Sequence, residues 1–143
     1  MGGWVFFVIG KYEHGVQYYS VARSRLDGKG SRRIIAANRP FDAEALVGQG
    51  SHAYWLEAED RGLFIARASV DASNVDTRWR RVPRKGCHAR AEAHGVAISS
   101  RCLFIGCSDS SDVDRVRIKG KTRVKALSTG GKLTSGPVLA ATP

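Results

Sequence analysis

Three eight-residue windows of this chain align with one another, and they read VARSRLDG (Val21–Gly28), IARASVDA (Ile65–Ala72) and VDRVRIKG (Val113–Gly120). The first position is always Val or Ile, the third is always arginine, and the sixth is always Leu, Val or Ile. The windows follow one another at offsets of 44 and 48 residues. Self-similarity at such a period is typical of propellers and solenoids, in which each repeat is one supersecondary unit.

The segments around the windows have the character of short strands and recur in a fixed order. An aromatic strand precedes each window, at Val5–Val8, Ala53–Leu56 and Leu103–Gly106. A basic strand follows each window, at Arg32–Ile35, Trp79–Val82 and Arg123–Leu127. Upstream of the second and third units lies a strand of small apolar residues, at Glu44–Val47 and Gly95–Ile98. Four antiparallel strands in about 45 residues predict the blade of a β-propeller.

The chain is therefore predicted to be one all-β domain of about three four-stranded antiparallel propeller blades, over about residues 4–36, 41–83 and 91–127. A β-barrel or a sandwich is the alternative for strands of this length and spacing. Helical periodicity is almost absent, and Asp42–Leu46 (DAEAL) is the one candidate for a helix, which would be very short.

Several motifs resemble the YWTD-type blades of low-density-lipoprotein-receptor propellers, and more closely their bacterial relatives of uncharacterised function. The matching residues are Tyr54-Trp55, Ile65–Ala68, Val70-Asp71, Leu26–Gly28 and Gly95–Ile98. The chain departs from the pattern at Ala72, where the family has Gly, at Lys119, where it has Asp, and at Leu103-Phe104, where it has Tyr-Trp. The resemblance implies a propeller that binds a partner.

Three blades are too few to close a ring, because propellers carry about four to eight. We expect the ring to be completed by a homo-oligomer, with a dimer favoured. The segment 134–143 contains Gly136–Ala140, which resembles the inner-strand pattern and is expected to pair with the first unit as a closing strand. A chain cut from a longer propeller is the alternative.

Composition restricts the class of partner. The 143 residues carry 23 Lys and Arg against 13 Asp and Glu, a net charge of +10. This balance favours an anionic partner, so a polyanion or nucleic acid is one expected ligand beside a protein or a glycan. No segment has the length and apolarity of a membrane span, and Trp4–Ile9 is too short for a secretory signal. The location is left open between a cytoplasmic one, which is the default, and that of a chain shown without a leader that was removed.

No motif predicts catalysis, a metal site or a cofactor. The chain lacks the nucleophile, phosphate-loop and metalloprotease motifs, and its four histidines are scattered. Its cysteines (Cys87, Cys102 and Cys107) have no zinc-type spacing and are expected to be small buried hydrophobes. The acidic run Asp109–Asp114 is expected to be a polar hairpin tip rather than a cation site.

The candidate ligand-binding residues lie in the densest basic stretch, at Arg78, Trp79, Arg80, Arg81, Arg84 and Lys85. Strand alternation predicts Arg78 and Arg80 on one face and Trp79 and Arg81 on the other. The functional interpretation is an anion-binding edge in which Trp79 stacks on a base or sugar. The structural interpretation, which we favour, is a charged outer strand that prevents aggregation.

A second set of residues is expected to serve the repeat itself: Arg23, Arg67, Arg115, Asp27, Asp71 and Trp55. The arginines would cover apolar surface and bind backbone carbonyls or the Asp of the same turn, and Trp55 would lie in the core. These features predict a non-enzymatic β-propeller module that recognises a protein or a glycan. The alternatives are a basic nucleic-acid-associated protein, or a subunit of a large viral or ribonucleoprotein assembly, and an enzyme on a propeller scaffold.

Overall fold

The computed structural model describes residues 3–29, 33–39, 43–59, 62–82, 93–107, 112–119 and 124–128, and these contain strands and turns without a helix. The strands are β1 (Trp4–Glu13), β2 (Val16–Arg25), β3 (Arg33–Arg39), β4 (Ala43–Gln49), β5 (His52–Glu59), β6 (Gly62–Ser69), β7 (Val75–Arg81), β8 (Ala93–Ile98), β9 (Cys102–Cys107), β10 (Asp112–Arg117) and β11 (Val124–Ser128). The predicted all-β class is confirmed.

The strands form three antiparallel sheets in which neighbours in sequence are neighbours in space. The first sheet has the order β1-β2-β3, the second β4-β5-β6-β7, and the third runs from β8 to β11. Tight turns make this possible. In the β1–β2 turn, His14 and Gly15 have φ angles of 49° and 79°, as a two-residue type I′ hairpin requires.

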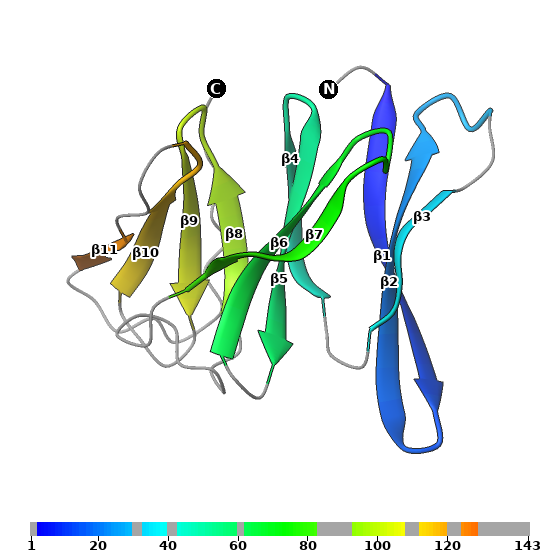
Figure 1. Cartoon of the computed structure of the whole chain (residues 1–143), viewed down its shortest axis with the longest axis horizontal. Helices are drawn as coiled ribbons and strands as arrows, with labels where there is room; N and C mark the ends of the chain where they lie inside the picture. Colours follow the sequence, from blue (N-terminus) through cyan, green and yellow to red (C-terminus); the bar gives the residue numbers. More distant parts are fainter. Residues whose placement is uncertain are drawn as a thin grey trace.

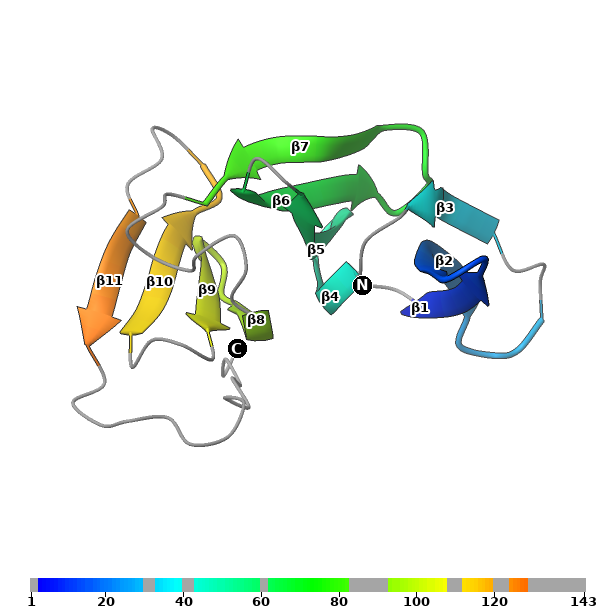
Figure 2. The same cartoon turned by 90° about the horizontal axis from the view of Figure 1, so that it is seen from below.

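The sheets stand side by side in sequence order, with the second sheet between the other two (Figure 1). Their first strands, β1, β4 and β8, lie next to one another, since β4 contacts both β1 and β8. Figure 2 shows β3, β7 and β11 on the opposite, outer side of the arc. The described strands do not close into a ring.

Two apolar clusters hold the three sheets together. One joins the second and third sheets and contains Tyr54, Leu56, Leu63, Ile65, Val82, Val96, Leu103, Ile105 and Val116. The other joins the first and second sheets and contains Tyr19, Val21, Ile35, Ala36, Trp55, Ala66 and Ala68. The second sheet is therefore covered on both faces, which explains why β6 is apolar on both sides of its pleat.

One sequence-based prediction is wrong. The candidate helix is Asp42–Leu46, and its described residues, 43–46, lie on strand β4, which pairs with β5 from Ala43 to Gln49. A segment of five residues is too short to form a stable helix, whereas a strand there gains the hydrogen bonds of the β5 ladder. The predicted closing strand at 134–143, together with Arg84, Lys85, Cys87 and Asp109–Ser111, lies outside the described residues.

Candidate functional site

The repeated arginine occupies the same register position in all three sheets. Each lies directly opposite an aromatic residue of the preceding strand, in the pairs Arg23–Phe6, Arg67–Tyr54 and Arg115–Phe104. Residues opposite one another in an antiparallel pair share a face, so each of these arginine side chains lies beside an aromatic side chain. The repeat found in the sequence is thus also a repeat of side-chain placement.

The first two sheets turn their arginine-bearing face toward the sheet that follows them in sequence. Strand alternation places Arg23 on the face of Val21, which packs against Trp55 of the second sheet. It places Arg67 on the face of Ile65, which packs against the third sheet. The sheets therefore stack in one direction.

The corresponding face of the third sheet is an outer face. Leu103 and Val116, which lie opposite one another, pack against the second sheet. Alternation then places the Arg115–Phe104 and Arg117–Cys102 pairs on the face turned away from it. We call this surface the outer face of the third sheet.

An indole covers the repeat arginine in the first two sheets. The Arg23 guanidinium carbon lies 4.2 Å from the centre of the Trp4 ring, and that of Arg67 lies 4.8 Å from the Trp79 ring. Both distances are those of cation–π contacts. Among the described residues, Arg115 has no such ring contact, and its buried Nε has no hydrogen-bond partner.

Each junction between sheets also contains a buried carboxylate on the face opposite the arginine. Glu57, 2% exposed, shares the face of Trp55 and accepts a hydrogen bond of 2.9 Å from the Trp55 Nε1. Asp114, 3% exposed, lies opposite Ile105 on the third-sheet face that meets the second sheet. Buried carboxylates need such partners, so each junction sets one acidic face against one basic face.

The Asp residues of the repeat organise their own turns. The backbone N–H of Lys29 donates to Asp27 Oδ1 at 2.9 Å, and that of Ser73 donates to Asp71 Oδ1 at 3.0 Å. The Asp71 carboxylate also accepts hydrogen bonds from the Ser69 and Ser73 hydroxyls. These bonds, with that of Ser69 the largest contribution, hold the pKa of Asp71 well below its ordinary range. The two carboxylates serve the turns.

The predicted ligand-binding edge on β7 is largely engaged within the protein. Arg78 forms a two-point ion pair with Glu59, through Nε at 3.0 Å and a terminal nitrogen at 2.6 Å. A terminal nitrogen of Arg80 donates to the Ile118 carbonyl at 3.3 Å, across the junction with the third sheet. Arg81 is exposed. These contacts favour the structural interpretation of this stretch.

Trp79 is surrounded by groups of the protein and packs against the core. Its ring lies 5.5 Å from the Tyr54 ring, and the guanidinium carbons of Arg67 and Arg80 lie 4.8 Å and 4.6 Å from its centre. Burial raises the pKa of Tyr54 above its ordinary value, while the two arginines oppose that rise. Trp79 is therefore part of the junction rather than an open stacking platform.

The predicted alternation of the β7 side chains is wrong. Arg78 and Arg81 both lie over the Phe64 ring, whereas Trp79 and Arg80 share the other face. The cause is an irregularity in the ladder, where the register changes between the Ile65–Arg80 and Arg67–Asp76 pairs. The ladder gains two residues on β7 there, so Asp76 and Arg80 stay on the face of Arg67, and Arg78 and Trp79 between them depart from simple alternation.

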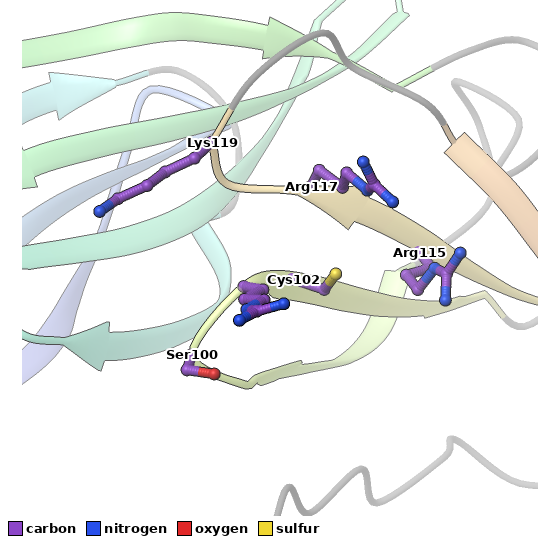
Figure 3. A pocket seen from close by; sticks show the side chains of 6 residues that line it. Ser100, Cys102, Arg115, Arg117 and Lys119 are labelled. Carbon is purple, nitrogen blue, oxygen red and sulfur yellow. The ribbon is translucent and has the colours of Figure 1, made fainter.

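A pocket on the outer face of the third sheet escaped the sequence-based prediction. The cavity has a volume of about 410 Å³ and is lined by Ser100, Arg101, Cys102, Arg115, Arg117 and Lys119. In Figure 3, Arg115 and Arg117 project from β10 beside Cys102 of β9, while Lys119 extends away from the two guanidiniums. Among the described residues that line it, four are cations and none is an acid. The missed signal is the alternation Arg115-x-Arg117, which places two cations on one face of β10, followed by Lys119 just beyond the strand.

The described residues contain no cluster of three or more His, Cys, Asp or Glu that would hold a metal ion. Cys102 carries a free thiol and is half-buried, which differs from the full burial expected for it. In the described part of the chain, no helix has the length and apolarity to cross a membrane.

Comparison with known proteins identifies neither a family nor a relative: no family model matches the chain, and no curated protein matches it.

Proposed function

We propose that this chain is a non-enzymatic interaction module built as part of a β-propeller, with three blades formed by the three described sheets. The observation that carries the proposal is the directional stack, in which the repeat arginine recurs at one register position and the arginine face of one sheet meets the next. Inner strands side by side and basic strands on the outside are typical of blades around an axis.

We propose further that a second copy of the chain supplies the remaining sheets. The stack leaves one face of the first sheet and one face of the third sheet without a neighbouring sheet among the described residues. Three blades from each of two copies give a ring within the size range of known propellers. Cyclic association then brings the open face of the third sheet of one copy against the open face of the first sheet of the other. The ligand of the assembled ring would be a protein or a glycan.

The solution mass tests the ring. Light scattering after size-exclusion chromatography should give twice the 15.5 kDa mass of the chain. A mass of one chain at all concentrations would reject completion by a second copy. Binding is tested separately on an array of glycans, where a propeller that binds by stacking and hydrogen bonds should retain its ligand as salt is raised.

A nucleic-acid partner is the second candidate, and the cationic lining of the third-sheet pocket favours it over a neutral ligand. Its affinity for single-stranded RNA or DNA should fall steeply and linearly on a plot of log Kd against log salt. The slope counts the phosphate contacts, so the two candidates give different salt dependences in the same instrument.

A further inference from the structure

We propose that the outer face of the third sheet is an anion-binding site for a ligand that carries phosphate or sulfate groups. The site is the pocket lined by Ser100, Arg101, Cys102, Arg115, Arg117 and Lys119. Its volume of about 410 Å³ is that of a small-molecule site. The inference rests on the proposed function only in so far as ligand binding is what the module does.

The repeat itself indicates what is missing at this face. In the first two sheets, the face that carries Arg23 or Arg67 meets a sheet whose facing side holds a buried carboxylate, Glu57 or Asp114. Arg115 also lies opposite an aromatic residue, Phe104, at the same register position, but no sheet of the described chain covers the face that carries it. An acidic group is therefore the missing complement of this face.

Arg115 also differs from the repeat arginines of the other two sheets in the groups that surround it. Arg23 and Arg67 each lie against an indole of their own sheet, Trp4 and Trp79. The Nε of Arg115, like that of Arg23, is buried without a hydrogen-bond partner, but in the described part of the chain no indole covers the Arg115 guanidinium. A buried donor without an acceptor is costly, and an oxyanion supplies that acceptor.

The other open face of the stack does not supply the charge. By strand alternation, β1 and β2 contribute ten residues to the outer side of the first sheet: Val5, Phe7, Ile9, Lys11, Glu13, Val16, Tyr18, Ser20, Ala22 and Ser24. Its one acid among these described positions, Glu13, is already paired with Lys11. A second copy that docked with this side against the pocket would bring no counter-charge, so the junction would need an anion bound between the two sheets, and we assign this neutralising group to a soluble ligand.

The chemistry of the lining selects the ligand class. The guanidinium forks of Arg115 and Arg117 match the oxygen pairs of phosphate and sulfate, and the Ser100 hydroxyl adds a neutral donor. Four cations favour a ligand with at least two negative charges. Phosphate and sulfate esters share this chemistry, and two probes separate them: inorganic pyrophosphate and a sulfated disaccharide.

The test measures the binding of both probes by isothermal titration calorimetry. The variant carries Arg101→Ser and Arg117→Ser, two exposed positions whose loss leaves the core untouched. The control carries Arg25→Ser and Lys29→Ser, which remove the same charge from exposed positions at the end of β2 and in the turn after it. We expect saturable binding of at least one probe to the wild type and the control, and a Kd about tenfold or more higher in the variant.

A second variant, Arg115→Gln, tests the buried donor. We expect it to lose the rise in Tm that the bound probe gives to the wild type, and its own Tm without probe shows whether it folds. Equal losses in variant and control would reduce the effect to net charge and overturn the site. So would the absence of saturable binding of either probe, or binding of an acidic peptide alone.

The experiments distinguish a failure of the dimer proposal from a failure of the proposed anion site. The mass of each sample is measured with and without the probe. A monomer that binds pyrophosphate through Arg117 keeps the site and rejects completion by a second copy, whereas a dimer that binds neither probe rejects the site and keeps the ring.

Discussion

Ala72 stands in the second sheet where Gly28 stands in the first, and both residues have a left-handed backbone, with φ angles of 60° and 67°. The two turns share their hydrogen bonds as well. The N–H of Gly28 donates to the Arg25 carbonyl at 3.2 Å, and that of Ala72 donates to the Ser69 carbonyl at 2.8 Å. One turn has the residue that its backbone favours, and the other has a residue that is strained there.

The pair predicts opposite effects for two reciprocal substitutions. Ala72→Gly should raise the free energy of unfolding by up to about 1 kcal/mol, because glycine adopts positive φ without steric cost. Gly28→Ala should lower it by about 1–2 kcal/mol, since an added Cβ meets no atom within 4 Å and the effect is purely conformational. Urea titration of both variants measures this, and changes of the same sign would contradict it.

Replacing Trp55 should cost most of any single substitution in the core. The side chain is 1% exposed and packs at the junction of the first and second sheets. Trp55→Ala should lower the free energy of unfolding by about 3–5 kcal/mol. Trp55→Phe keeps much of the packing but removes the hydrogen bond to Glu57, so its cost should be smaller, about 1–3 kcal/mol. An unchanged Tm in Trp55→Ala would show that the junction is not a core.

Neighbouring arginines on β7 should differ in their effect on stability. Arg80 binds the Ile118 carbonyl and lies against Trp79, so Arg80→Ala should lower the free energy of unfolding by about 1–2 kcal/mol. Arg81 is exposed and lies farther from its ring, at 6.0 Å from the centre of Phe64, so Arg81→Ala should lower the free energy of unfolding by less than Arg80→Ala does. The two variants have the same net charge, so equal effects in thermal unfolding would contradict the junction contact.

Acid should remove the contribution of Asp71. Its folded pKa is lowered by hydrogen bonds from Ser69 and Ser73, so its stabilisation is present above the ordinary carboxyl pKa of 3.8 and is lost as pH falls below it. The stability difference between wild type and Asp71→Asn should therefore shrink from about pH 6 to about pH 3. Chemical unfolding at several pH values measures it, with Ser73→Ala as a variant that should weaken the same effect.

The repeat made the sheets predictable, because each unit carries its own local signals. The Arg-bearing windows, the aromatic strands before them and the basic strands after them fall on β2, β6 and β10 and their neighbours. Local chemistry also fixed the turn at Ala72, where the position required glycine-like geometry whatever residue occupied it. Strand alternation of this kind depends on neighbours close in sequence.

Features set by packing between sheets were not predictable in this way. The bulge that moves Arg78 and Arg81 onto one face depends on how β7 fits over the second junction. The pocket joins Arg101 of the β8–β9 turn to Arg117 on β10, which only the β9–β10 register brings together. The stacking of the sheets also determines which cations have no indole over them and no sheet facing them. Composition therefore indicated that the protein is basic, but not where its cationic site lies.

The one-way stacking of the sheets has a consequence for growth. The open face of the first sheet differs from the open face of the third sheet, so copies of the chain can associate head to tail, and such association has no fixed limit. Only the rotation between successive sheets decides whether addition closes after a fixed number of copies or continues as a filament. The cationic pocket on the outer face of the third sheet would oppose such addition, because each added copy must desolvate these charges and supply a counter-charge.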